Sequence, residues 1–338
     1  MLDNFVESTI RRLNIRTLLI SLAGLLVVFA GLAINTRYLY NMFLGPFPLE
    51  RNKLLTLSNT GDLFQYYVTV QGDDHGDTGF TYVSTSDSGT ETIEYYYHAL
   101  LFGRRVLLVK SKSAEIQNEQ IGALVNLTPD IQKDLIDKLE QEIPELKGKF
   151  LPIMLDTVNF HTNGYIGLAI AALVGLLSGL GMLLALYRLL NSQAHPALKK
   201  LSRFGSLDAV SNEIDMEMIQ PHEQVGKKLH FTHRWLVSTT SSLEVVPYRD
   251  ILWCYMQVTQ HRTNGIPTGK TYTALIFNRY GGNISIQGKE KFVNEILQAV
   301  VRFAPGTVVG YSDEIVNLWK NNLAGFAKAV DERRQSSR

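Results

Sequence analysis

The sequence has only one cysteine, Cys254, so no disulfide framework can hold any part of this protein together. Each domain must therefore be stabilised by its own hydrophobic core. Cys254 lies in an apolar stretch, where a thiol is expected to pack as a small hydrophobic group. No serine lies in a nucleophile elbow either. The sequence thus lacks the usual nucleophilic sites.

Metal-binding and phosphate-binding motifs are also incomplete. Segment 265–271 resembles a Walker A loop, but it has too few residues before its Gly-Lys-Thr, and a strand-like segment follows it. The acidic segment 72–77 lacks the spacing and the closing glutamate of an EF-hand. His230 and His233 should lie on opposite faces of a strand, and His222 lies in a predicted loop. We therefore predict a protein that is not an enzyme and that has no cofactor and no metal site.

Charge is missing from two long apolar runs, residues 17–34 and 165–186, which contain no Asp, Glu, Lys, Arg or His. Helices of this length can cross a hydrocarbon core of about 30 Å. We predict two transmembrane helices that anchor the chain and do not conduct ions. A cleaved signal peptide is the alternative for the first run, because Gly31 and Ala33 suit a signal peptidase. The second run remains in either case.

The charged residues divide unevenly between the remaining segments. Residues 41–162 contain 10 Lys/Arg against 17 Asp/Glu, a net charge of −7, and residues 187–338 contain 19 against 13, a net charge of +6. Arg16 precedes the first apolar run and Arg188 follows the second. Basic residues favour the cytoplasmic ends of membrane spans. We predict that both termini lie in the cytoplasm and that the middle domain lies outside.

The middle domain shows strand patterns at 64–71, 79–84 and 92–110, followed by a helix that Thr128 and Pro129 begin. We predict a small β-rich outer domain with one helix, for which an OB-like barrel is one candidate fold. The second apolar run has small residues at strict four-residue intervals, which predict a close helix-packing seam with the first span or with a second copy. Chance recurrence of small residues is the alternative. The series is Gly167, Ala171, Gly175 and Gly179.

The C-terminal part has several short strand patterns followed by an amphipathic helix at 289–303. This order is typical of a pleckstrin-homology (PH) β-barrel, with a further C-terminal helix after it. Two segments resemble the opening and the end of bacterial PH-like domains: "HFTHRWLVSTTSSLEVVPYRDILWCYMQ" and "NISIQGKEKFVNEILQAV". As a whole, the chain resembles uncharacterised bacterial two-span membrane proteins with a C-terminal PH-like domain. The resemblance implies the bacterial cytoplasmic (inner) membrane and carries no established activity.

Many PH domains bind acidic head groups through basic residues on a hairpin loop. His261, Arg262 and Lys270 are therefore candidates for an anionic-lipid contact, and solvated loop charges are the alternative. The expected α+β membrane protein divides as follows: 1–16, interfacial helix; 17–40, transmembrane helix; 41–162, extracytoplasmic domain; 163–188, transmembrane helix; 189–221, juxtamembrane helices; 222–305, PH-like domain; 306–338, C-terminal amphipathic helix.

Two functions fit this organisation. The first is a protein that senses or binds something outside and docks a partner or the membrane surface through its cytoplasmic domain. The second is an oligomeric scaffold, or accessory subunit of a membrane complex, assembled through the small-residue face of the second span. The expected partners are the lipid bilayer and either another protein or a second copy, and no nucleic acid.

Overall fold

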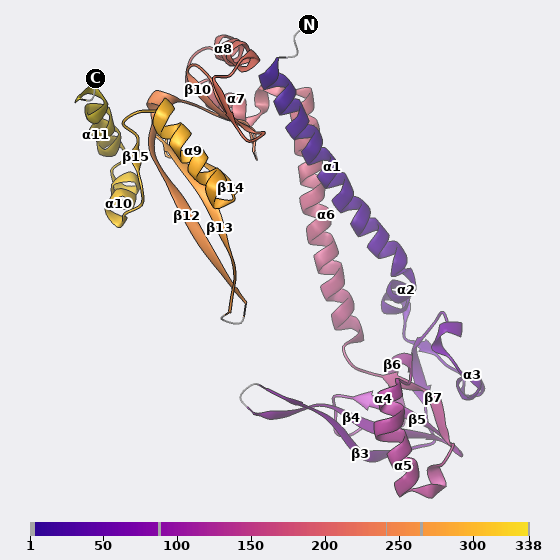
Figure 1. The fold of residues 1–338 in the computed structure, drawn as a ribbon. Coiled ribbons are helices and arrows are strands. Elements are labelled where there is room, and N and C mark those ends of the chain that lie inside the picture. The colour runs from indigo at the N-terminus through magenta and orange to yellow at the C-terminus, as the bar shows by residue number, and fades with distance from the viewer. Residues whose placement is uncertain (1–3, 87–88, 241, 264–265, 337–338) are drawn as a thin grey trace. The chain divides into compact units, whose positions relative to one another are not determined.

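The computed structural model describes residues 4–86, 89–240, 242–263 and 266–336. The chain divides into two compact units. We call Met1–Ile20 together with Leu180–Arg338 the terminal unit, and Ser21–Gly179 the central unit. Figure 1 shows the elements of each unit along the chain.

Two long helices, α1 (Phe5–Ile34) and α6 (Phe160–Leu190), carry the apolar runs. Only 6% of the 18-residue apolar segment of each helix is buried. Both are long and apolar enough to cross a membrane, and their exposure differs from that of a core helix in a soluble domain. The prediction of two such helices is confirmed. Residues 5–16 continue α1 and do not form a separate helix.

The central unit is built on one mixed seven-stranded sheet, in the order β1-β2-β6-β7-β5-β4-β3. The pairs β1–β2 and β5–β7 are parallel and the others are antiparallel. The strands are β1 (Phe47–Pro48), β2 (Tyr67–Gln71), β3 (Asp74–Thr85), β4 (Glu91–Phe102), β5 (Arg105–Ser111), β6 (Glu119–Asn126) and β7 (Phe150–Asp156). The order is open, with β1 and β3 at its edges, so an OB-like barrel is not confirmed.

Each face of this sheet has its own apolar core. On one face, a helical segment packs through Leu135 and Leu139 against Leu108. On the other, Leu54 of α3 (Arg51–Thr56) joins the sheet core. Thr128 and proline begin the helical segment as predicted, and it consists of α4 (Pro129–Ile131), a π-helical turn (Gln132–Ile136) and α5 (Asp137–Glu142). A further helix, α2 (Thr36–Leu44), follows α1.

The terminal unit contains two four-stranded sheets. The first is antiparallel, in the order β11-β10-β9-β8, and the second has the order β14-β13-β12-β15. Helix α9 (Glu290–Phe303) follows β14, and β15 adds to β12 in parallel. The strands are β8 (Glu223–Val225), β9 (Leu229–Phe231), β10 (Trp235–Ser238), β11 (Glu244–Pro247), β12 (Ile251–Thr263), β13 (Ile266–Asn278), β14 (Asn283–Gly288) and β15 (Val308–Val309).

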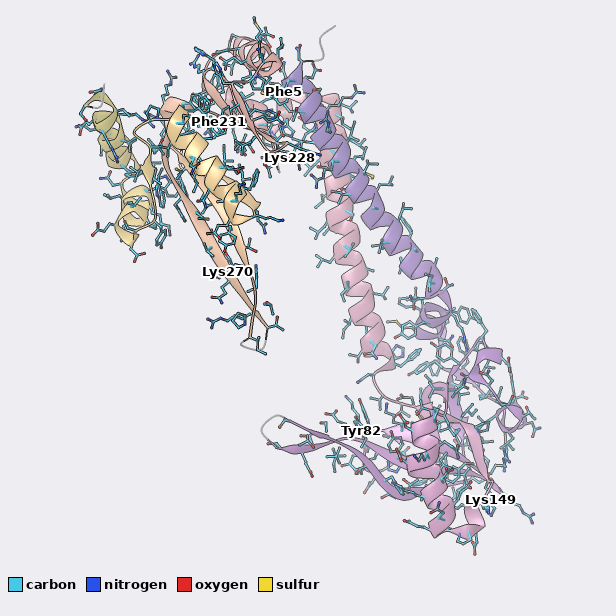
Figure 2. The ribbon with its side chains drawn as sticks, in the orientation of Figure 1. Phe5, Tyr82, Lys149, Lys228, Phe231 and Lys270 are labelled. Carbon is cyan, nitrogen blue, oxygen red and sulfur yellow. The ribbon has the colours of Figure 1, made fainter. Side chains whose placement is uncertain are left out.

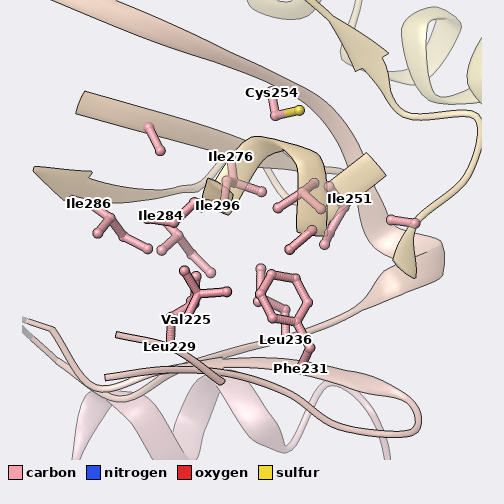
Figure 3. Close-up of a cluster of buried hydrophobic side chains, with 14 of the residues drawn as sticks. Val225, Leu229, Phe231, Leu236, Ile251, Cys254, Ile276, Ile284, Ile286 and Ile296 are labelled. Carbon is pink, nitrogen blue, oxygen red and sulfur yellow. The ribbon is translucent and has the colours of Figure 1, made fainter. Parts of the chain in front are cut away.

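One hydrophobic core lies between the two sheets and α9. Figure 3 shows Phe231 and Leu236 of the first sheet pointing toward Ile284 of the second and Ile296 of α9. Cys254 belongs to this core, and burial raises the pKa of its thiol to about 12. Cys254 is therefore a buried hydrophobic group, as predicted. Several short strands followed by an amphipathic helix were predicted and are present, but a PH-like identity is not confirmed.

The C-terminal segment forms two helices, α10 (Asp313–Asn321) and α11 (Leu323–Ser336), where one helix was expected. Asn322 separates them, because its side chain accepts the N–H of Gly325 at 3.0 Å and so caps the second helix. Phe326 and Val330 of α11 pack against Trp253 of β12, as expected of an amphipathic helix.

A second core of the terminal unit includes the start of α1. Val6 and Ile10 are each only 2% exposed, and they pack with side chains of α7 (Pro196–Leu201), α8 (Leu207–Ile219) and β10. Trp235 of β10 is fully buried in the same cluster. The apolar stripe expected to lie on a membrane interface is thus covered by protein.

This core predicts that the first helix contributes directly to the stability of the terminal unit. Ile10→Ala should lower the free energy of unfolding by about 2–4 kcal/mol, because it leaves a cavity among buried side chains. The neighbouring exposed residue gives a matched control, and Arg11→Ala should change stability by less than about 0.5 kcal/mol. Denaturant unfolding of the full chain in detergent, followed by tryptophan fluorescence, measures both. Equal effects of the two substitutions would contradict the prediction.

Candidate functional site

A cavity of about 510 Å³ lies in the terminal unit where α1 enters it and α6 ends. Its size falls within the range of small-ligand sites. Three segments of the chain supply its walls: α1, the end of α6 with α7, and the start of β11. The polar and charged side chains that matter most are Asn14, Arg16, Arg188, His195, Lys200 and Glu244.

The cavity has an excess of positive charge. Lys200 donates to both carboxylate oxygens of Glu244, at 2.8 and 3.1 Å, and Ser242 donates to the same carboxylate at 3.0 Å. The single negative charge is therefore already paired. Within the described ranges, no acceptor is bonded to the guanidinium of Arg16 or Arg188. Both arginines thus remain available to an anion.

Two further side chains can donate hydrogen bonds. His195 is 8% exposed, and its Nδ1 accepts the N–H of Ala197 at 3.2 Å, which assigns the proton of the neutral ring to Nε2. Burial, and then the charge of Arg188, lower the pKa of His195, so the neutral form prevails at pH 7. Asn14 is 2% exposed, and its Nδ2 has no partner among the described residues.

This arrangement suits the binding of an oxyanion. Guanidinium groups bind carboxylate or phosphate oxygens through paired, charge-assisted hydrogen bonds. A neutral imidazole and a side-chain amide add donors without adding charge. From the sequence, Arg16 and Arg188 indicate only the topology of the chain. Asn14, His195 and Lys200 were missed, because three segments far apart in the chain form this cavity.

A second polar contact lies at the first turn of α1. Asp215 of α8 accepts the N–H of Val6 at 2.9 Å, across 209 positions of the sequence. The first N–H groups of a helix have no partner within it, and a carboxylate there also opposes the positive helix end. Burial raises the pKa of Asp215, against the lowering effect of the N–H groups of Val6 and Phe5. Its Oδ2 has no partner in the part of the chain described.

The predicted seam residues on α6 take a limited part in the contact with α1. In the central unit, a Cβ added to Gly24 would collide with Ser178, and one added to Gly164 would collide with Met42. By contrast, no heavy atom lies within 4 Å of a Cβ built at Gly167, Gly175 or Gly179. Residues four apart rotate by about 40° per step around an α-helix, so the series cannot stay on one face.

Two members of the series lie beside α1 without tight packing. Gly167 and Ala171 line a groove of about 360 Å³ whose other wall includes Val28 and Gly31 of α1. Gly175 and Gly179 are absent from that groove. A seam between copies of the chain stays a prediction.

The predicted basic residues lie on the exposed arm formed by β12 and β13, where Figure 2 labels Lys270. In the register of the two strands, Lys270 lies opposite Gln260, and His261 lies opposite Gly269. Because side chains alternate between faces, Lys270 and His261 lie on opposite faces of the arm, and a register shift between His261 and Arg262 interrupts the alternation there. The ring Nε2 of His261 lies 2.7 Å from Thr271 Oγ1. An anionic-lipid contact by these residues stays a prediction.

The segment that resembles a Walker A loop forms the start of β13, apart from residue 265, which lies outside the described residues. Residues 266–271 thus lie in a strand that pairs with β12, where a hairpin loop was expected. In the acidic segment, Asp73 forms a bidentate ion pair with Arg51 at 2.6 and 2.8 Å, and this hydrogen bonding lowers the pKa of the Asp73 carboxyl. That carboxylate is thus already occupied by an arginine.

The histidines do not form a metal site in the described part of the chain. His222 Nε2 and His233 Nδ1 lie 3.4 Å apart. His230 points elsewhere, with its ring 6.4 Å from that of Phe5. Among the described residues, no group of three or more His, Cys, Asp and Glu side chains could hold a metal ion.

Comparison with known proteins identifies one shared domain. Residues 211–319 match a family model described as a domain of unknown function (DUF6709). This region contains both sheets of the terminal unit, α9 and most of α10. No curated protein and no solved structure matches the chain. The match assigns no activity, and of the cavity residues Asn14, Arg16, Arg188, His195 and Lys200 lie outside it.

The contact between Asp215 and α1 predicts a pH-dependent stability. Because burial raises the pKa of Asp215 above its ordinary value, ionisation is more costly in the folded chain. The stability due to the protonated carboxyl is fully present below the ordinary pKa of the unfolded chain. It is lost as the pH rises through the raised pKa of the folded chain. Asp215→Asn keeps an acceptor for Val6 and removes the titration, so its difference from wild type should grow with pH.

Thermal unfolding of the full chain in detergent, between about pH 3 and pH 7, tests this. Asp215→Ala also removes the helix cap, and it should lower the free energy of unfolding by about 1 kcal/mol relative to Asp215→Asn. If the difference in melting temperature between wild type and Asp215→Asn is the same at every pH, the assignment is contradicted.

Proposed function

We propose that this chain is a non-enzymatic two-span protein of the bacterial cytoplasmic membrane, with both termini in the cytoplasm. In this proposal the central unit lies outside and binds a ligand or partner. The terminal unit is a PH-like module inside the cell, and it docks a protein partner or the anionic membrane surface. The two long apolar helices and their exposed surfaces support the membrane part of the proposal.

One observation carries the proposal furthest: both long helices lead into the same compact unit. The start of α1 and the end of α6 belong to the terminal unit together with the C-terminal domain. Val6 and Ile10 lie in its core, and α7 follows α6 after a short connection. In the proposed topology, the start of α1 and the end of α6 therefore lie on the same side of the membrane. A displacement of either helix would act directly on packed side chains of the docking module.

The same contacts favour retention of the first span over its removal as a signal peptide. Cleavage after Ala33 would strip Val6 and Ile10 from a core and leave Asp215 without its helix end. The net charge of +6 on residues 187–338 fits a cytoplasmic position, since each basic residue near an anionic leaflet can add about 1 kcal/mol of attraction. The strand order supports a PH-like module.

The proposed topology predicts which introduced cysteines react in intact cells. Cys254 is fully buried with a raised thiol pKa, so the wild-type chain should give no background with a membrane-impermeant maleimide. Lys138→Cys, at an exposed position of α5, should react in intact cells. Lys328→Cys, where the native side chain is 79% exposed, should react only after the membrane is permeabilised.

The readout is the mass of the labelled chain after membranes are isolated. Reaction of Lys328→Cys in intact cells would overturn the orientation. Recovery of the chain in the soluble fraction after carbonate extraction would overturn the membrane proposal itself. Both variants change one exposed lysine to cysteine, so each serves as the other's control.

A second candidate function is an oligomeric scaffold assembled through α6. The observation in its favour is the open space around Gly175 and Gly179, which leaves their backbone free for a second helix. If so, Gly175→Leu with Gly179→Leu should convert oligomers to monomers. Ala172→Leu, an exposed small residue outside the series, is the matched control. Light scattering of the detergent-solubilised chain measures the mass, and an unchanged mass in the glycine variant would contradict this candidate.

A further inference from the structure

We propose that the cavity where α1 and α6 meet the terminal unit binds the phosphate of an anionic phospholipid head group. Phosphate is the shared chemistry of this lipid and of free inorganic phosphate, and the structure favours the lipid. The inference rests on the proposed two-span topology and adds to it a specific lipid site.

The first argument is the charge of the cavity. Three cationic side chains, Arg16, Arg188 and Lys200, surround it against one carboxylate, Glu244, which leaves a net charge of +2 with His195 neutral. Lys200 already compensates Glu244. The two arginines repel each other without an anion between them, and a phosphate with a single negative charge relieves this repulsion. A head group that also carries an ammonium group would restore part of this repulsion.

The second argument is a buried donor without an acceptor. Asn14 lies on the cavity wall and is 2% exposed, yet its Nδ2 has no hydrogen-bond partner in the described ranges. Buried side-chain amides almost always have partners, because leaving one unpaired is costly. A phosphate oxygen in the cavity would accept from Nδ2. His195 also lines the cavity, and its Nε2–H would supply another donor.

The third argument is the level of the cavity relative to the apolar runs. Arg16 directly precedes the first run, and Arg188 lies two residues after the second. In a two-span protein these positions coincide with the head-group region of the cytoplasmic leaflet. Ile20, which is 62% exposed, lines the same cavity one turn of α1 after Arg16, inside the apolar run. An acyl chain would cover this side chain, whereas free phosphate would not.

The test uses the full chain purified in detergent. Bound lipid is measured by native mass spectrometry after incubation with phosphatidylglycerol, with phosphatidylcholine, or with inorganic phosphate alone. We expect one phosphatidylglycerol to bind more tightly than phosphatidylcholine. Arg16→Gln and Arg188→Gln should each weaken its binding by about tenfold, the effect of one lost charge-assisted hydrogen bond.

Two variants separate this site from general effects. Lys199→Gln removes one positive charge from an exposed position of α7 outside the cavity, and it should leave the affinity unchanged within about twofold. Arg188→Lys keeps the charge but loses the planar fork, so its affinity should lie between those of wild type and Arg188→Gln. Thermal unfolding without lipid shows whether each variant is folded, and Arg188→Lys provides the test if Arg188→Gln is not.

Each other outcome overturns the inference. Equal binding of the two lipids removes the requirement for an anion. Unchanged phosphatidylglycerol binding in Arg16→Gln and Arg188→Gln places the lipid elsewhere. Inorganic phosphate that binds alone and displaces the lipid makes the ligand a free anion. Carbonate extraction of the same variants distinguishes these failures from failure of the membrane proposal: a chain that stays in the membrane without binding lipid overturns only the cavity.

Discussion

The terminal unit depends on one packing constraint: the first two turns of a long apolar helix are part of a domain core built from the other end of the chain. Val6 and Ile10 fill space between α7, α8 and the buried Trp235. Asp215 closes the same contact by accepting a backbone N–H at the helix start. A helix fixed by both packing and a cap has little freedom to slide or rotate at that end. The cavity depends on this fixation, because Asn14 and Arg16 lie two and three turns beyond Val6 on the same helix.

Much of the fold could be predicted because its signals are local. Two charge-free runs predict the long helices, and Thr128 followed by proline predicts the start of the helical segment in the central unit. The presence of several strands before α9 and the buried state of Cys254 follow from short-range patterns of apolar residues. Periodicity along one segment contains this information, since it reflects which face of that segment is covered.

The candidate site could not be predicted, because its geometry comes from contacts that periodicity does not encode. Asn14 appears in the sequence as a polar residue beside an apolar run, and nothing local shows that Lys200 and Glu244 lie at the same cavity. The four-residue series on α6 is only partly reflected in the contact between α6 and α1. Its spacing is regular in the sequence, but the helical turn of 3.6 residues carries Gly179 away from the face of Gly167. The collisions that a side chain would make occur at Gly24 and Gly164 instead.

The separation of 209 positions between Val6 and Asp215 also determines when the terminal unit can be completed during synthesis. At about 5–20 residues per second, the ribosome needs roughly 10–40 s to add the residues between these two partners. Throughout that interval the apolar stripe of Phe5, Val6, Ile10 and Leu13 has been made, but the helices and strands that cover it have not. The first turns of α1 therefore acquire their native partners only after α8 has been made.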